Sequence, residues 1–126
     1  MILALLPLAT AVAPPPAVLS VNDPDLRCMV AVSFAMGAAQ SKGADAETVG
    51  SMSAVFMYFL GKSDARHPGE NYAPAFARVV AERDYEQRLP ADLQRCGAEA
   101  EARGAMLKQL DEQLRPIVPQ APASAG

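Results

Sequence analysis

The chain has 126 residues, of which 51% are hydrophobic and 6% aromatic, and its formal net charge at pH 7 is −3. One domain accounts for this length. Basic and acidic side chains are interleaved instead of forming a patch of one sign, which argues against a nucleic-acid partner. Abundant alanine and few β-branched residues favour helix over sheet. We therefore expect an all-α fold, a single four-helix bundle with one disulfide between helices.

The amino-terminal segment predicts export. Residues 2–13 (ILALLPLATAVA) form an uncharged apolar run that is followed by three consecutive prolines. A dozen apolar residues suit the core of a signal peptide and fall short of the ~20 that a transmembrane helix needs. We assign residues 1–13 to a signal peptide, which predicts a periplasmic or secreted protein with no integral membrane segment after processing. The alternative is an uncleaved apolar arm that packs on the domain or on a membrane surface.

Residues 14–22 are expected to be a linker, and residues 23–115 the helical domain. The first helix should start at Asp23, because an aspartate side chain can accept from the free N–H groups of a first turn. Residues 28–39 carry no charge, and a helix that is apolar on nearly every side is surrounded by protein. This helix should therefore be the central one. It should end just before Gly43, which can take the left-handed conformation.

The second helix is predicted from Asp45 to Gly61, because apolar residues recur there every three or four positions. A polar loop over residues 62–71 should follow it. Near the end of this helix, five bulky side chains stand in a row and cannot all face one neighbour. They are interpreted either as a helix end packed between two others or as a partly exposed patch that binds a partner. The candidate contact patch comprises Phe56, Met57, Tyr58 and Phe59.

A third helix is predicted from just after Asn71 to about Arg88, where Pro90 should bend or break the chain because it lacks an N–H donor. The last helix then runs from Pro90 to Leu114, and residues 116–126 form a disordered tail by composition. Small residues in the middle of its apolar stripe should let its backbone pack closely on the central helix. This stripe comprises Leu93, Cys96, Gly97, Ala100, Gly104, Leu107, Leu110 and Leu114.

Cys28 and Cys96 are the two cysteines of the chain, and both fall on predicted buried faces of the first and last helices. In an exported chain they are most simply a disulfide. Closing this loop would remove unfolded-state entropy worth roughly 4 kcal/mol. The alternative is two separate buried thiols in a cytosolic protein.

The sequence indicates no catalytic, cofactor-binding or metal-ligating residue. His67 is the sole histidine, and one imidazole cannot assemble a zinc site or a catalytic triad without other groups within reach. The glycines match neither a phosphate-binding loop nor a dinucleotide fingerprint. We therefore expect no cofactor and no enzymatic activity, with an enzyme whose site is unrecognised as the last alternative.

Three motifs carry a family resemblance that spans residues 23–115. They are Cys28-x-x-Ala31-x-Ser33-x-Ala35-Met36-Gly37, Phe56-Met57-Tyr58-Phe59-Leu60-Gly61 and Asp92-Leu93-x-Arg95-Cys96-Gly97. The chain resembles small exported helical two-cysteine proteins of alphaproteobacteria, of the sphingomonad type. The resemblance implies a helical fold and export, and no activity. A looser likeness is to HdeA-type periplasmic acid-stress chaperones and to Tai-type immunity proteins of type VI secretion amidases.

These observations lead us to expect a non-enzymatic periplasmic protein that acts through protein–protein contacts. A stress-chaperone version has a physical basis, because acid neutralises the 14 carboxylates and leaves 11 Lys and Arg and one His charged. Self-repulsion would then loosen the helices and expose apolar surface. The alternative is an inhibitor or immunity-type binder of a cell-wall hydrolase.

Overall fold

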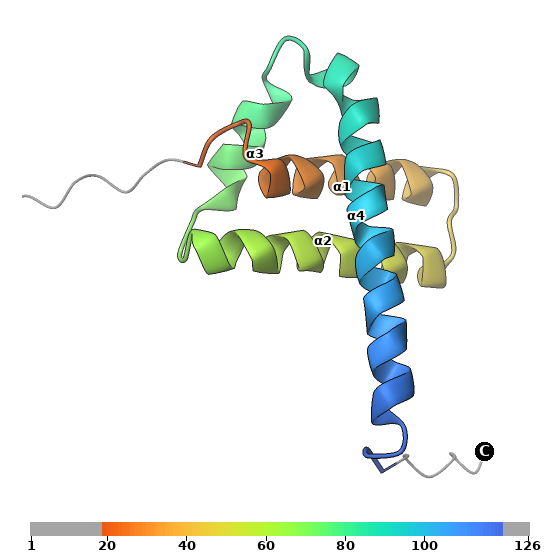
Figure 1. Ribbon diagram of the computed structural model, residues 1–126. Coiled ribbons are helices and arrows are strands. Elements are labelled where there is room, and N and C mark those ends of the chain that lie inside the picture. The colour runs from red at the N-terminus through yellow and green to blue at the C-terminus, as the bar shows by residue number, and fades with distance from the viewer. Residues whose placement is uncertain (1–18, 120–126) are drawn as a thin grey trace, which may run out of the picture.

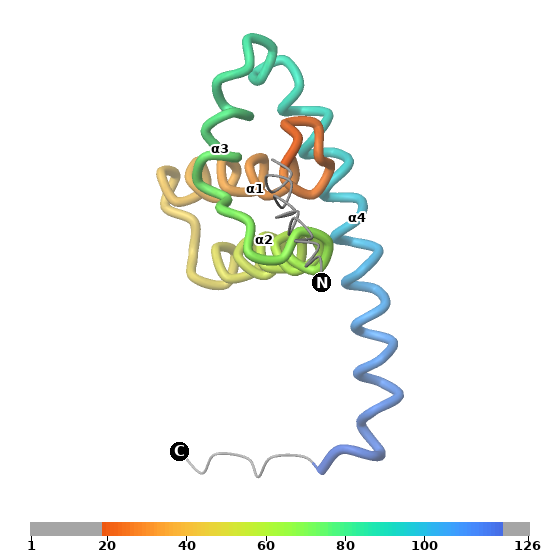
Figure 2. The backbone as a smooth tube through the Cα atoms, turned by 90° about the vertical axis from the view of Figure 1, so that its left-hand side faces the viewer, coloured from red at the N-terminus to blue at the C-terminus, as the bar shows by residue number. Residues whose placement is uncertain are grey.

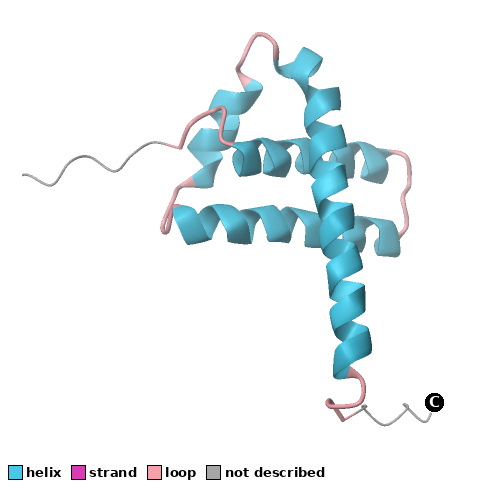
Figure 3. Ribbon diagram, in the orientation of Figure 1, coloured by secondary structure: helices cyan, strands magenta, loops and turns pink. Residues whose placement is uncertain are grey.

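The computed structural model describes residues 19–119, and these residues form four helices and no strand. Figures 1 and 3 show the helices, which are α1 (Pro24–Ser41), α2 (Ala46–Arg66), α3 (Tyr72–Val80) and α4 (Tyr85–Leu114). The predicted all-α fold of four helices with an interhelix disulfide is confirmed. The predicted signal peptide, residues 1–13, lies outside the described residues, as do parts of the expected linker and tail.

The helices are arranged around α1. Figure 1 shows α1 and α2 running side by side in opposite directions, with α4 crossing both of them steeply. Helix α1 packs against each of the other three helices. Beyond α2, the carboxyl-terminal part of α4 continues away from the body, as both Figure 1 and Figure 2 show.

The starts of α1 and α2 are those that the capping residues predict. Asp23 Oδ1 accepts hydrogen bonds from the backbone N–H groups of Asp25 and Leu26, both at 3.0 Å. Asp45 caps α2 by accepting from the N–H of Thr48 at 2.8 Å. The turn between these two helices passes through Gly43, which has a φ of 76°. These caps satisfy donors that the first turn of a helix leaves free.

The core forms around the first half of α1. Every residue from Asp25 to Val32 is buried, which confirms that this part of α1 is central. The second half is less enclosed, because Phe34 is 47% exposed. Leu19 is also buried, so packing extends into the segment expected to be a linker. The core comprises Leu19, Leu26, Cys28, Met29, Val30, Phe59, Ala75, Val79, Tyr85 and Cys96.

Helix α2 is longer than its sequence pattern predicts. It continues past Gly61 to Arg66, so the first half of the loop expected over residues 62–71 is helical. Ion pairs explain the extension, because Lys62 and Arg66 both reach the carboxylate of Asp25 on α1. The local spacing of apolar residues does not predict such contacts between helices.

The boundary between α3 and α4 also differs from the prediction. Helix α3 ends at Val80, and α4 begins at Tyr85, so Pro90 lies inside α4 in its second turn. A proline so near the start of a helix removes one backbone hydrogen bond while most of the helix follows it. The chain turns instead near Glu82, whose carboxylate accepts from Arg27 at 2.8 Å and from Arg88 at 3.1 Å.

The predicted close packing along α4 is wrong in its carboxyl-terminal part. All residues from 101 to 119 are exposed, including the three leucines of the predicted stripe in this part. A methyl group placed on Gly97 or Gly104 would meet no other atom within 4 Å. Helix α4 approaches α1 at Cys96, and the two glycines leave open space beside the helix.

Candidate functional site

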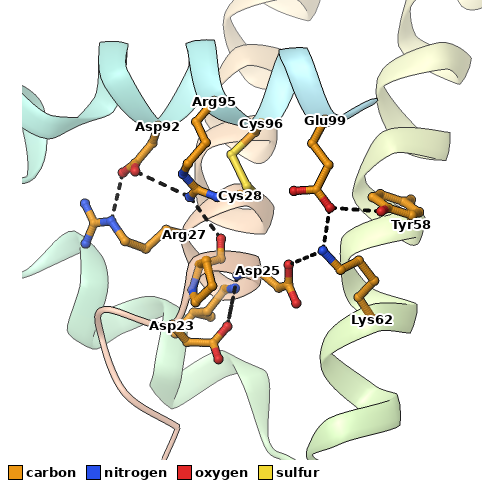
Figure 4. Close-up of a disulfide and its surroundings, with 12 residues drawn as sticks. Asp23, Asp25, Arg27, Cys28, Tyr58, Lys62, Asp92, Arg95, Cys96 and Glu99 are labelled. Carbon is orange, nitrogen blue, oxygen red and sulfur yellow. Dashed lines mark hydrogen bonds and ion pairs between the residues drawn. A yellow bond between two sulfur atoms is a disulfide. The ribbon is translucent and has the colours of Figure 1, made fainter. Parts of the chain in front are cut away.

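The disulfide between Cys28 and Cys96 joins α1 to α4. Their Cα atoms lie 5.5 Å apart, and the two residues are separated by 68 positions in the sequence. Both cysteines are buried. Figure 4 shows Asp92 and Glu99 on α4, one on either side of Cys96. The covalent link is therefore flanked by charged groups that also connect helices.

Arg27 carries the first group of contacts. Its side chain is 3% exposed, and its Nε donates to Asp92 Oδ2 at 2.8 Å. Its Nη1 donates to Glu82 Oε1 at 2.8 Å and to the carbonyl of Val21 at 3.1 Å. Burial alone would lower the pKa of Arg27, but the hydrogen bonds that it donates to Asp92 and Glu82 raise the pKa above its ordinary value. Arg27 thereby ties α1 to α4 and to the segment that precedes α4.

Asp25 and Glu99 carry the second group of contacts, in which Lys62 of α2 bridges α1 and α4. Lys62 Nζ lies 3.0 Å from Asp25 Oδ1 and also donates to Glu99, which accepts from the hydroxyl of Tyr58 at 2.9 Å. Arg66 donates to Asp25 Oδ2 at 2.5 Å. The hydrogen bond from Lys62, helped by that from Tyr58, lowers the pKa of Glu99. Burial would lower the pKa of Lys62, but its two carboxylate partners raise it.

We call these charged residues the ionic cluster. Their role is to hold the helices together, since buried charges are tolerated where each is paired and hydrogen-bonded. Sequence reasoning missed the cluster because its ion pairs join residues that are far apart in the sequence. The available signal was an arginine next to a long uncharged run, at the start of a helix expected to be central. The cluster comprises Asp23, Asp25, Arg27, Lys62, Arg66, Glu82, Asp92 and Glu99.

An open apolar hollow of about 180 Å³ lies where α4 leaves the body, between α2 and α4. At its edge the Nε of Arg103 donates to the hydroxyl of Tyr58 at 2.9 Å. Small side chains leave this space open, so it can accept a larger apolar group from outside. Its lining comprises Ala54, Val55, Tyr58, Ala100, Arg103, Gly104 and Leu107.

Beyond the hollow, residues 101–114 of α4 form what we call the projecting half. Leu107, Leu110 and Leu114 are 59%, 44% and 39% exposed, and Ile117 just after the helix is 74% exposed. Isolated helices of this length are marginal in water. A row of exposed leucines on such a helix is characteristic of an interaction surface.

The four residues of the predicted contact patch lie in different surroundings. Phe59 is fully buried, and Phe56 packs edge-on against Phe76 with ring centroids 6.3 Å apart. Tyr58 lines the hollow and bonds to Glu99, whereas Met57 is 59% exposed. The four side chains therefore do not share one surface. Tyr58 is the member that connects the predicted patch with the hollow.

His67 lies at the carboxyl end of α2, beside the ionic cluster. Its Nε2 is 3.7 Å from Asp23 Oδ2, and its side chain is 34% exposed. Within residues 19–119, no three His, Cys, Asp or Glu side chains gather closely enough to hold a metal ion. The imidazole therefore lies near the carboxylate that caps α1.

No protein-family model matches the chain, and neither curated proteins nor solved structures give a match. None of the four described helices is both long and apolar enough to cross a membrane. The fold and the site define a class of protein: a small helical domain fastened by one disulfide, from which a helix with one apolar face projects. Function is inferred from this geometry.

Proposed function

We propose that this chain is a non-enzymatic protein of the periplasm or of the secreted space, and that it acts by binding a helix of a protein partner. The observation that carries the proposal is the projecting half of α4, where three leucines lie exposed in one row. The hollow at its root continues this apolar surface toward α2. An amphipathic helix that lies along such a surface buries its apolar face, a common mode of recognition between proteins.

The disulfide supports the proposed location outside the cytosol. Disulfides persist in oxidising environments outside the cytosol and are rare inside it. Cys28 and Cys96 are paired and buried, and the apolar run of residues 2–13 has the length of a signal-peptide core. Both features favour export, and each can be checked by mass spectrometry of the protein purified from its host.

A photo-crosslinking experiment tests the binding proposal. A photoreactive amino acid replaces Leu110 in the exposed row, and in a matched control it replaces Ala105, which is exposed on another face of α4. After irradiation in the host, we expect protein adducts from position 110 and few from position 105. Equal labelling from the two positions, or no adduct from either, would overturn the proposal.

The ionic cluster favours a second candidate function, that of an acid-responsive chaperone. Its five carboxylates connect α1, α2 and α4 through buried or half-buried cations. Protonation at low pH removes these contacts and leaves the charge of Arg27 buried, while the disulfide still holds α1 to α4. We expect the chain to suppress aggregation of a client protein at about pH 2–3 and not at neutral pH. Failure to suppress aggregation in acid would remove this candidate.

A further inference from the structure

We infer that the helix bound by the projecting half belongs to a second copy of this chain, which lies antiparallel to the first in a two-fold dimer. The inference rests on the proposed function and names its partner. It also places the apolar ends of the two projecting helices in each other's hollows.

The exposed face of α4 has the spacing of a coiled-coil seam. Its positions alternate three and four residues apart, a period of 3.5 that keeps one face turned toward a partner helix. Five of the six side chains are apolar, and Arg103 is the exception. The seam comprises Ala100, Arg103, Leu107, Leu110 and Leu114 on α4, and Ile117 in the turn that follows the helix.

The seam is complementary to itself when one copy is reversed. Its spacing reads the same in both directions about a point between residues 108 and 109, so a two-fold axis placed there aligns it with its own copy. Leu107 then faces Leu110 of the second copy, and Ala100 faces Ile117. The small Ala100 of one copy thus meets the large Ile117 of the other. The hollow beside Ala100 provides the room for that tip.

Charge selects this arrangement over the parallel one. In a parallel pair in register, Arg103 would face its own counterpart, and like charges would repel. In the antiparallel pair Arg103 faces Leu114, and Asp111 of the second copy lies one turn away from that leucine. In the single chain Asp111 pairs with Arg115 at 2.9 Å, and these side chains are 62% and 66% exposed. Such an exposed pair is weak and leaves Asp111 able to accept from Arg103.

The flanking charges do not oppose the pairing. Residues 101–118 carry three acidic and three basic side chains, so two copies of this segment have no net repulsion, although each whole chain carries −3. At the positions beside the seam, Gly104 faces Asp111 of the second copy and Met106 faces Gln113. Neither pair brings like charges together.

Sedimentation velocity over a range of concentrations tests the dimer. We expect the disulfide-bonded chain to dimerise and Leu107→Glu to remain monomeric. Ala105→Glu, which adds the same charge outside the seam, should dimerise as the unmodified chain does. Leu107 is 59% exposed in the single chain, so its replacement leaves the fold intact, which circular dichroism checks. A chain that stays monomeric at every concentration would overturn the inference.

Charge reversal and a distance measurement test the register. Arg103→Asp and Asp111→Arg should each weaken dimerisation about tenfold or more, and the double variant should restore it. A spin label on Ala98→Cys should lie about 30 Å from its counterpart in the antiparallel dimer, given a rise of ~1.5 Å per residue. A separation of about 10 Å would indicate a parallel pair and overturn the inference.

The crosslinking experiment described above separates the failure of this inference from that of the proposed function. Adducts from position 110 that contain a second copy of the chain support both. Adducts with a different protein, from a chain that is monomeric, retain the proposed function and overturn the dimer. The absence of adducts together with a monomeric chain overturns both.

Discussion

The two halves of α4 belong to one continuous helix and differ in their contacts with the rest of the domain. The first half is fastened to α1 by the disulfide at Cys96 and by the pair between Asp92 and Arg27, and Glu99 bonds to α2. The projecting half, residues 101–114, exposes every side chain. The apolar spacing runs through both halves without a change. A periodic pattern therefore shows which face of a helix is apolar. Whether the same domain covers that face depends on specific contacts, here the disulfide and the ion pairs.

Loss of the disulfide should have the largest effect, and it should act on the first half. Reduction, or Cys28→Ala with Cys96→Ala, should lower the free energy of unfolding by roughly 4 kcal/mol. Domains of this size are commonly stable by only about 5–15 kcal/mol, so the chain should be close to unfolding. Urea titrations with and without reductant measure this, with the double variant as a control that reductant does not affect. An unchanged midpoint would show that the other contacts suffice.

A matched pair of arginine substitutions compares the ionic contacts of the two halves. Arg27→Met removes the cation of a buried cluster and should cost about 3 kcal/mol, because its carboxylate partners stay behind without it. Arg115→Met removes an exposed pair at the end of the projecting half and should cost less than about 0.5 kcal/mol. Both are measured by thermal and urea unfolding. Equal costs would contradict the distinction between an anchored and an exposed half.

Glycine replacements should have a smaller effect, and an opposite sign. Gly97→Ala lies in the anchored half with space for a methyl group, so it should stabilise the chain by about 0.5–1 kcal/mol. Gly104→Ala should raise the helical signal in circular dichroism and leave the unfolding of the body unchanged in dilute samples. Destabilisation by Gly97→Ala would show that the backbone of α4 does approach a neighbour there.

The smallest effect is a pH dependence at Glu99, which sits at the border of the two halves. Its pKa is lowered in the folded chain, so its contribution is present above its ordinary pKa and is lost as the pH falls through the lowered value. The partner Lys62 is 37% exposed, which screens the pair. Glu99→Gln should therefore cost less than about 1 kcal/mol near pH 7 and almost nothing near pH 2. Urea unfolding at both pH values measures the difference, and an equal cost at both would contradict the assignment.

Features that depend on a few neighbouring residues or on covalent chemistry were predictable from the sequence. The caps at Asp23 and Asp45 and the turn at Gly43 follow from local hydrogen bonding and from the backbone freedom of glycine. The pairing of Cys28 with Cys96 follows from their number and from the helix faces on which they lie. Each of these features needs no knowledge of how the helices are arranged.

Features that depend on contacts between distant segments were not predictable. Helix α2 extends to Arg66 because of an aspartate on α1, and α3 ends at Val80 near a glutamate that Arg27 binds. The apolar stripe of α4 indicated a buried face throughout, yet Leu107 is 59% exposed. Hydrophobic periodicity does not say where the covering surface ends, and the exposed part is the part to which we assign binding.

Hydrogen exchange along α4 compares its two halves within a single sample. In the disulfide-bonded chain, diluted so that it is monomeric, we predict slow amide exchange for residues 89–98 and fast exchange for residues 103–114, because only the first half is held by tertiary contacts. Equally slow exchange in both halves would mean that the second half packs against the body. That result would contradict the claim that its apolar face is exposed in the single chain and free to bind a partner.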